Sequence, residues 1–374
     1  MKPAIPIVII GAGLSGLICA ILLRKNGYQV TVIEKKQFPF HRVCGEYVSN
    51  EVLPFLASLQ LDISQLNPSR ISGLNLTSAS GKSLALPLQM GGFGISRYAL
   101  DHYLYREATS RGVEFIFDKA SDIAFADENF TISLSSGKTV NGHLAIAAYG
   151  KRSNLDQKLK RRFFYERSPY IGVKYHIKTD LPVDLIRLDN FEGGYCGTCK
   201  IEDDLYNLCY LSANRNLKNH GSIPEMEQKV LYKNPHLKQI FENSEFIFAK
   251  PEVINEISFE KKSLVEDHIL FCGDAAGMIT PLCGNGMAIA IHSAKILAEC
   301  ITGSGTSLDP WQRFALETKY CETWEHQFAL RMRSGRWIQE LFLNLNLSNF
   351  AVGIMRHSAI LSRKLIKSTH GKPF

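Results

Sequence analysis

The sequence predicts an α/β protein, with α+β elements, built around a Rossmann-type dinucleotide-binding domain. Near the amino terminus a glycine-rich turn, GAGLSG, stands between an apolar, β-branched run and a helical stretch. A second glycine-rich stretch, FCGDAAGMITPLCGNGMA, lies at residues 271–288 and carries an aspartate just after its first glycine. Two such turns in one chain of 374 residues predict that one long ligand is held at both of its ends.

The first turn lies within a strand–turn–helix–strand pattern. The run IPIVII has the composition of a parallel strand buried on both faces, and the stretch after the turn is helical in character up to Lys25. A second apolar strand, QVTVIE, ends at Glu34. The apolar amino terminus therefore begins a folded domain and is not expected to be a signal peptide or a membrane span.

Each residue of this motif has a mechanical task. Gly11 permits the tight turn, Gly13 lets a pyrophosphate approach bare backbone, and Gly16 lets the helix pack closely on the strand. The amino terminus of the helix offers free N–H groups and a positive dipole to phosphate. Glu34 can accept hydrogen bonds from the ribose hydroxyls of an adenosine, so the motif predicts a bound dinucleotide.

The second turn distinguishes FAD from a nicotinamide cofactor. The short strand ILFCGD ends at Gly273 and Asp274, and a helix with many small residues is expected from about Met287 onwards. The Asp274 carboxylate can accept charge-assisted hydrogen bonds from the ribityl hydroxyls of FAD. The amino terminus of the helix, at Gly286 and Met287, would face the flavin pyrimidine edge, where negative charge collects on reduction.

On these residues the chain resembles the FAD-dependent oxidoreductases of the p-hydroxybenzoate-hydroxylase superfamily, and within them the geranylgeranyl-reductase branch, over most of residues 5–300. The distal motif GDAAG…P..G.GM is matched at 273–287, where Gly277 replaces the histidine usual in aromatic hydroxylases. The motif RVCGE is matched at 42–46. The pattern R..LD..L...A...G is matched by Arg97, Leu100, Asp101, Leu104, Ala108 and Gly112.

The resemblance implies a set of cofactor-binding residues. Arg42 and Arg97 are expected to contact the ribityl-pyrophosphate region of FAD. The complete predicted set is Gly11, Gly13, Gly16, Glu34, Lys35, Arg42, Arg97, Gly273, Asp274, Pro281, Gly284, Gly286 and Met287.

Two stretches depart from the family pattern. Hydroxylases of the superfamily carry an Asp-Gly motif associated with FAD and NAD(P)H, whereas this chain has Tyr149-Gly150. The electron donor is therefore left open between NAD(P)H and another transient reductant. The reductase signature YGWIFP is matched only by Gly194, Tyr195 and Gly197, so the pocket and its substrate are expected to differ.

More than one interpretation stays open for Cys44, Glu46 and Lys174. By resemblance, Cys44 lies beside the flavin ring and orients or protonates substrate; alternatively it is a packed core cysteine. Glu46 is an acid or base near the flavin, or a solvated loop carboxylate. Lys174, in the alternating strand YIGVKYHIK, contacts substrate, faces solvent or backs the sheet, and Tyr195 is the second substrate candidate.

The domain organisation is expected to be discontinuous. A Rossmann-type FAD-binding domain would comprise residues 1–60, 95–160 and 262–310, interleaved with a mostly antiparallel β-sheet substrate domain at 61–94 and 161–261. Residues 311–374 are expected to form C-terminal helices.

Composition narrows the remaining classes. The net charge of +7 resides in residues 331–374, while residues 1–330 sum to zero, so a nucleic-acid partner is not expected. The basic end packs on the body or makes peripheral contact with an anionic membrane. Nine cysteines without a disulfide pattern favour a cytoplasmic protein. No histidine has metal-ligand spacing, a metal is not expected, and the absence of GxSxG leaves hydrolase chemistry without support.

The sequence thus predicts an FAD-dependent oxidoreductase acting on a hydrophobic unsaturated or aromatic metabolite. By resemblance to geranylgeranyl reductases, reduced flavin would deliver hydride to a double bond. The alternative is an aromatic monooxygenase that uses NAD(P)H and oxygen. A non-catalytic escort protein on the same scaffold is a third hypothesis, which the retained fingerprint residues disfavour. The substrate and the oligomeric state are left open.

Overall fold

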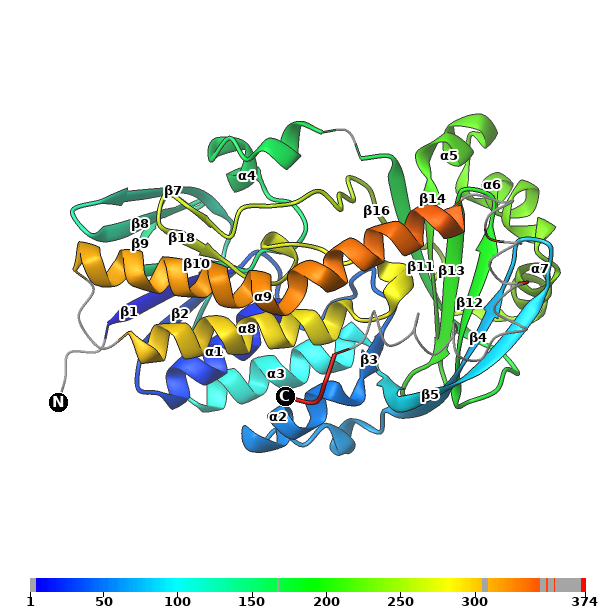
Figure 1. Cartoon of the computed structure of the whole chain (residues 1–374), viewed down its shortest axis with the longest axis horizontal. Helices are drawn as coiled ribbons and strands as arrows, with labels where there is room; N and C mark the ends of the chain where they lie inside the picture. Colours follow the sequence, from blue (N-terminus) through cyan, green and yellow to red (C-terminus); the bar gives the residue numbers. More distant parts are fainter. Residues whose placement is uncertain (1–4, 167, 305–308, 344–347, 349–352, 354–370) are drawn as a thin grey trace.

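The structure is a computed structural model that describes residues 5–374 except 167, 305–308, 344–347, 349–352 and 354–370. Two sheets lie at opposite ends of the molecule, and a long helix runs alongside both (Figure 1). The α/β fold class, with one Rossmann-type sheet and one largely antiparallel sheet, is as the sequence predicts.

The first sheet has six strands in the order β17-β18-β10-β1-β2-β6. Its pairs are parallel except the antiparallel pair at the β17 edge, and the apolar residues of its central strands are buried, as expected for a sheet covered on both faces. The strands are β1 (Pro6–Ile10), β2 (Gln29–Glu34), β6 (Glu114–Phe117), β10 (Leu144–Ala147), β17 (Val265–Glu266) and β18 (Ile269–Phe271).

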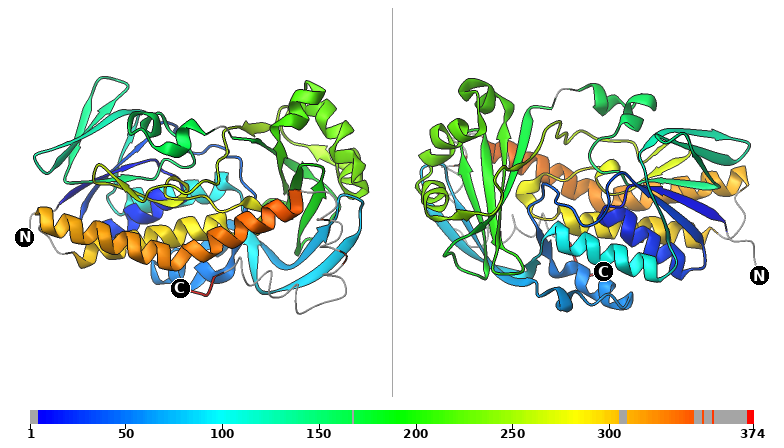
Figure 2. Two further views of the ribbon diagram at one scale, coloured as in Figure 1. Left: turned by 45° about the horizontal axis from the view of Figure 1, so that its top comes forward. Right: turned by 180° about the vertical axis from the view of Figure 1, so that it is seen from behind.

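Three helices cover one face of this sheet and a small sheet adjoins the other (Figure 2). The helices are α1 (Leu14–Lys25), α3 (Arg97–Ser110) and α8 (Gly286–Gly303). The small antiparallel sheet consists of β7 (Ala120–Ala126), β8 (Asn129–Leu134) and β9 (Thr139–Gly142). Helices α1 and α8, which begin at the two glycine turns, pack against each other, so the turns lie at the same end of the domain.

The second sheet has nine strands in the order β15-β11-β14-β13-β12-β4-β5-β3, with β16 also paired to β11. All pairs are antiparallel except β12 with β4. The strands are β3 (Tyr47–Ser49), β4 (Ser69–Thr77), β5 (Ser83–Gly94), β11 (Tyr170–Lys178), β12 (Leu185–Phe191), β13 (Gly194–Lys200), β14 (Tyr206–Ala213), β15 (Glu245–Phe246) and β16 (Glu252–Ile254).

The two faces of this sheet differ. Helices α5 (Asn214–His220), α6 (Ile223–Lys229) and α7 (Pro235–Asn243) lie at its outer side (Figure 1). The opposite face turns toward the first sheet. Strand β3 comes from the amino-terminal segment, directly after the motif RVCGE, so that motif crosses from one sheet to the other.

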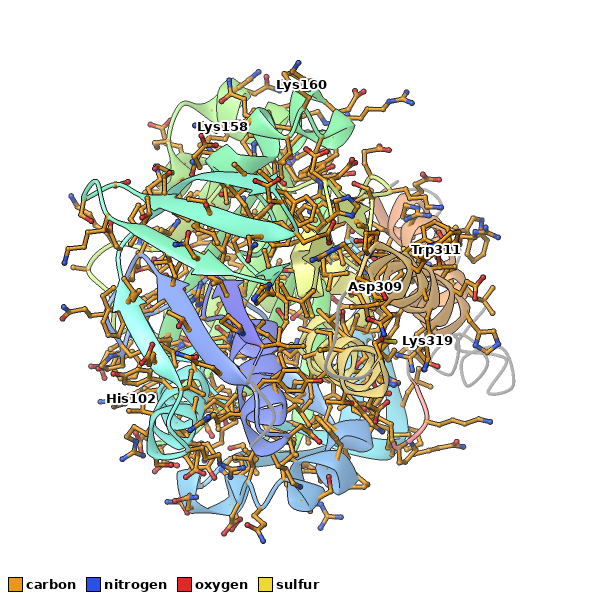
Figure 3. All side chains as sticks on the ribbon, turned by 90° about the vertical axis from the view of Figure 1, so that its left-hand side faces the viewer. His102, Lys158, Lys160, Asp309, Trp311 and Lys319 are labelled. Carbon is orange, nitrogen blue, oxygen red and sulfur yellow. The ribbon has the colours of Figure 1, made fainter. Side chains whose placement is uncertain are left out.

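Helix α9 (Pro310–Leu343) is one continuous element of 34 residues that packs on α8 and, further along, on β12 and β13. Trp311, near its start, is 82% exposed and lies on the surface (Figure 3). Of the eight basic residues at the carboxy-terminal end, Arg356, Arg363, Lys364 and Lys367 lie outside the described residues. Within the described part of the chain, no helix is both long and apolar enough to span a bilayer.

Candidate flavin and substrate site

The first glycine turn has the geometry of a phosphate cradle. Gly11 adopts φ +102°, and a Cβ there would lie 2.6 Å from the carbonyl oxygen of Ala148. A Cβ at Gly16 would collide with the carbonyl oxygen of Gly11, so α1 approaches the strand more closely than a side chain allows. Gly13 is the N-cap of α1 and offers no side chain, which leaves the first N–H groups of the helix available to an anion.

Glu34 lies buried at the end of β2, beside this cradle. Its carboxylate accepts hydrogen bonds from the main-chain N–H groups of Ala12 (3.0 Å) and Lys36 (3.1 Å), and it lies 3.3 Å from the Arg42 guanidinium. These bonds fix the carboxylate at the carboxyl end of the strand, where the ribose is expected. Lys35, the neighbouring residue, is exposed.

Two arginines lie over the turn and share one carboxylate. Asp101 accepts from Arg42 at 3.1 Å and from Arg97 through two bonds of 2.7 Å. One guanidinium nitrogen of Arg97 lies 3.7 Å from the point that a Cβ at Gly13 would occupy. Both arginines therefore lie where a pyrophosphate on the cradle would need positive charge.

The second turn touches the first. Gly273 adopts φ +63°, and a Cβ there would collide with Oγ of Ser15 in α1. Asp274 is half-buried, and no hydrogen bond reaches its carboxylate from the described part of the chain. Burial raises the pKa of this carboxyl, against the opposing charges of Lys262, Arg97 and Lys151. A half-buried, unpartnered acceptor beside the cradle fits a ligand rich in hydroxyl groups.

The rest of the second turn leads into α8. A one-turn helix, Pro281–Cys283, ends at Gly284 with φ +63°, and α8 begins at Gly286 with no side-chain cap. Met287 is buried in the core. Two parts of FAD beyond its pyrophosphate are polar. The N–H groups at the start of α8 fit the flavin pyrimidine edge, and the carboxylate of Asp274 fits the ribityl hydroxyls.

The Asp274→Asn variant is expected to bind FAD about 10- to 100-fold more weakly, because a charge-assisted hydrogen bond contributes about 1.5–3 kcal/mol. Titration of the apoprotein with FAD, followed by flavin fluorescence, measures the dissociation constant. The matched control is Asp267→Asn, because Asp267 is an exposed carboxylate in the turn that precedes the same strand. Equal FAD affinity in Asp274→Asn and the parent protein would contradict the assignment.

The segment that carries Cys44 is bound to the inner face of the second sheet. Asn207 of β14 donates to the carbonyl oxygen of Cys44 (3.1 Å). The Cys199 thiol of β13 lies 3.6 Å from the carbonyl oxygen of Gly45. Cys44 itself is half-buried. Burial raises the pKa of its thiol, against the opposing charge of Arg97, so Cys44 is a protonated thiol at neutral pH.

Glu46 is the centre of a buried charge cluster between the sheets. One carboxylate oxygen lies 2.5 Å from Nζ of Lys174 and 2.8 Å from the main-chain N–H of Arg97; the other lies 2.7 Å from Nε2 of His176. Glu46 is fully buried and adopts φ +52°. Burial alone would raise the pKa of Glu46, but Lys174 and His176 outweigh it and hold that pKa below its usual value.

These contacts decide between the interpretations of two residues. The solvated interpretation of Glu46 is wrong, because its carboxylate is buried, and an ionised carboxylate with three donors is better suited to position its neighbours than to donate a proton. The solvent-facing interpretation of Lys174 is also wrong, because Lys174 is fully buried. In β11, Lys174 and His176 share the inner face, since alternate residues of a strand point the same way.

Small and apolar side chains line the inner face next to Cys44. Gly197 and Cys209, which pair across β13 and β14, are both half-buried. A Cβ at Gly197 would meet no atom closer than 3.7 Å, so this position leaves room above the sheet. Tyr195 is buried, and its hydroxyl has no hydrogen-bond partner in the described part of the chain.

Tyr195 belongs to an apolar cluster that joins the sheet to the second turn and to α9. Its buried members from the sheet and from these two elements include Leu188, Tyr195, Leu211, Leu282, Ile338 and Phe342. Leu282 lies in the one-turn helix that precedes Gly284, so this buried cluster extends to the second glycine turn.

Tyr149 is part of a different polar cluster. Its hydroxyl donates to Asp156 (2.6 Å), which also accepts from Arg161 at 2.9 Å. Arg161 is buried and donates to the carbonyl oxygen of Ala275 at 3.0 Å. The carboxylate of Asp156, seven residues after Tyr149, thus holds Arg161, and Arg161 in turn bonds the main chain of the turn that carries Asp274.

Sequence reasoning missed His176, Asn207 and Cys209, which lie at the same place as Cys44 and Glu46. The signal for His176 was present, because it stands two residues after Lys174 in an alternating strand. Asn207 and Cys209 are recognisable only from the pairing of β14 with β11 and β13.

Comparison with known proteins agrees with this geometry. A family model described as FAD binding domain matches residues 4–308. The chain is 22% identical to the 1H-pyrrole-2-carbonyl-[peptidyl-carrier protein] brominase of Pseudoalteromonas luteoviolacea, over 92% of this chain and 88% of that protein. It is 23% identical to the digeranylgeranylglycerophospholipid reductase of Methanococcus vannielii, over 86% of this chain and 83% of that protein.

A further relative, conditioned medium factor receptor 1 of Dictyostelium discoideum, is 22% identical over 77% of this chain, which spans only 61% of that protein. Among solved structures, the flavin-dependent brominase Bmp2 superposes with a TM-score of 0.80 at 20% identity, covering 98% of this chain and 93% of the brominase. A geranylgeranyl bacteriochlorophyll reductase-like protein of Thermoplasma acidophilum gives 0.77 at 17% identity, covering 99% and 96%.

The family match spans both glycine turns and the sheet over them, and the residues at those turns fit FAD. The chain therefore belongs to the FAD-binding family of flavoprotein oxidoreductases, and it is an FAD-dependent oxidoreductase whose relatives include both geranylgeranyl reductases and flavin halogenases.

Proposed function

We propose that the protein reduces a carbon–carbon double bond of a hydrophobic metabolite, in the manner of the geranylgeranyl-reductase branch. The carrying observation is the half-buried thiol of Cys44, on a segment that is bound to the inner face of the second sheet at Cys44 and to Arg97 at Glu46. A double-bond reduction needs a proton donor at that place. The lipid reductase among the relatives supports this choice of substrate class.

The chemistry divides between cofactor and chain. FAD held at the two glycine turns would, once reduced, supply a hydride for one carbon of the double bond. Cys44 donates its thiol proton to the other carbon, and the nearby Arg97 guanidinium stabilises the thiolate that remains. A proton from solvent restores the thiol. One hydride, which carries two electrons and a proton, and one further proton thus balance the reduction.

The other residues bind and position. The apolar surface that includes Tyr195, Leu211 and Leu282 excludes water and receives the apolar part of the substrate. Glu46 holds the segment that carries Cys44 against the inner face, through its bonds to Lys174 and His176. It also accepts the main-chain N–H of Arg97, so one carboxylate sets the position of both the thiol and the arginine.

A second candidate is an oxygen-dependent oxidation of an aromatic ring, either hydroxylation or halogenation, with NAD(P)H or another donor as the reductant. The brominase supports this candidate, because its similarity covers 92% of this chain.

A simple absorption spectrum tests the hypothesis of a non-catalytic escort protein. The purified protein is expected to be yellow, whereas a colourless preparation that takes up no FAD would favour the escort hypothesis.

The two redox candidates are separated by reoxidation of the reduced holoenzyme. The probe for the first is digeranylgeranylglycerophospholipid, mixed without oxygen in D₂O. We expect the flavin to reoxidise and each reduced bond to gain up to two deuteriums, one through the exchangeable N–H of the reduced flavin and one through the Cys44 thiol. The probe for the second is an aromatic carrier-bound pyrrole with ¹⁸O₂ and bromide. Reoxidation only with oxygen, accompanied by ¹⁸O or bromine in the product, would overturn the reductase proposal.

A further inference from the structure

Residues 371–374 pack against the body of the protein beside the second flavin turn. Gly371 donates its main-chain N–H to a carboxylate oxygen of Glu51, and Phe374 donates its own to the carbonyl oxygen of Glu51 (3.3 Å). The Phe374 ring stacks on His292 of α8, with centroids 3.8 Å apart and planes 11° apart. The segment thus lies next to α8 and α2 (Leu53–Ser58), near the point marked C in Figure 1.

Glu51 connects this segment to the flavin turn. It is fully buried, and its other carboxylate oxygen accepts from Nδ2 of Asn285 (3.2 Å) and lies 3.6 Å from the guanidinium of Arg331. Asn285 immediately precedes Gly286, the first residue of α8. One buried carboxylate therefore joins residue 371 to the residue that positions the start of the flavin-facing helix.

The fit of the segment is specific. A Cβ at Gly371 would collide with the guanidinium of Arg331 and with the Glu51 carboxylate. A larger residue here would require the ends of the Arg331 and Glu51 side chains to shift, and Glu51 is the residue that accepts from Asn285. On the far side, the Phe374 ring lies 5.5 Å from that of Phe55, so it fills a gap between α2 and α8.

We propose that residues 371–374 are a strap that positions the flavin turn through Glu51 and Asn285, so that docking of the strap and binding of FAD favour each other. The proposal rests on FAD binding at the two glycine turns. Coupling between two sites is reciprocal: whatever factor the docked strap adds to FAD affinity, bound FAD adds to strap docking.

The test compares Phe374→Ala with Lys372→Ala in the full-length protein. Lys372 is exposed and is the matched control. We expect Phe374→Ala to weaken FAD binding about 10-fold, within the usual range of coupling between sites. Without any FAD, we expect the amides of residues 286–291 to exchange hydrogen faster in Phe374→Ala, while Lys372→Ala matches the parent in both measurements.

The pKa of His292 shows whether residues 371–374 are docked. Burial lowers the pKa of its imidazole to about 4, and the nearby positive charges of Arg331 and Lys295 add to the effect. Removal of the stacked ring is expected to raise this pKa, as measured by NMR titration. A deletion of residues 371–374 is the second variant, should Phe374→Ala leave the strap in place.

The proposal is overturned if the pKa of His292 rises, showing the strap displaced, while FAD affinity stays within twofold of the parent and exchange at residues 286–291 is unchanged. Failure of FAD binding as such has a different signature. In that case the parent protein itself would not bind FAD, whereas the exchange experiment on the apoprotein would still report on the strap.

Discussion

Replacing Cys44 with alanine is expected to lower turnover by about 100-fold or more, because a positioned proton donor contributes about 10²–10⁴ to a rate. FAD affinity is expected to stay close to that of the parent, since the cradle residues and Asp274 are untouched. The signature of a proton donor is a fall in the rate of flavin reoxidation by substrate, measured by stopped-flow absorbance, with little change in substrate affinity.

The matched control for this variant is Cys209→Ala. Cys209 is also a half-buried thiol on the inner face, but it belongs to strand β14 and not to the segment that follows the cofactor domain's second strand. Its replacement therefore tests the effect of removing a thiol's volume from the same face. We expect at most a severalfold effect. If Cys44→Ala and Cys209→Ala slow reoxidation equally, Cys44 is a packing residue and the proton must come from elsewhere.

Replacing Lys174 with methionine is expected to lower the free energy of unfolding by about 3–5 kcal/mol, because it leaves the buried Glu46 carboxylate without its lysine partner. Urea denaturation followed by far-UV circular dichroism measures the change. The double variant Glu46→Gln/Lys174→Met removes both charges, and we expect it to recover a large part of the loss.

The pH dependence of this variant has a definite sign. A carboxyl whose pKa is lower in the folded than in the unfolded chain stabilises the fold above its unfolded pKa, and this stability is lost as the pH falls through the folded pKa. Lys174 helps to hold the pKa of Glu46 low. Lys174→Met is therefore expected to lose less stability than the parent on acidification, so the difference in free energy of unfolding between the two proteins shrinks as Glu46 becomes protonated.

The control for the charge effect is Lys238→Met. Lys238 forms an exposed pair with Glu242, and such pairs contribute about 0–1 kcal/mol. A loss in Lys174→Met no larger than in Lys238→Met would show that the Glu46 cluster does not hold the two sheets together.

The cofactor side of the molecule could be predicted from the sequence because its chemistry is local. Gly11, Gly13, Gly16 and Glu34 lie within one strand–turn–helix–strand unit, and their spacing alone fixes how they meet a dinucleotide. Asp274 was recognisable for the same reason, since it follows an apolar strand and a glycine in the sequence.

The substrate side could not be predicted in the same way because its contacts are distant in sequence. Glu46 and Lys174 are 128 residues apart, and no local pattern states that a loop from the first domain lies on the inner face of β11. The acidic partner of Tyr149 was missed because it stands seven residues further on, at Asp156 in the next helix. The alternation of residues in β11 predicts which side chains share a face of the strand. Which segment packs against each face depends on the fold as a whole.

The uninterrupted helix α9 constrains how a bulky substrate can enter. It packs on α8 of the cofactor domain and on β12 and β13 of the other sheet, so it spans the junction between them. A large separation of the two sheets would require α9 to bend or to detach from one of them. Motion of the two sheets relative to each other is therefore limited by α9, and we expect a substrate to reach the inner face without their separation.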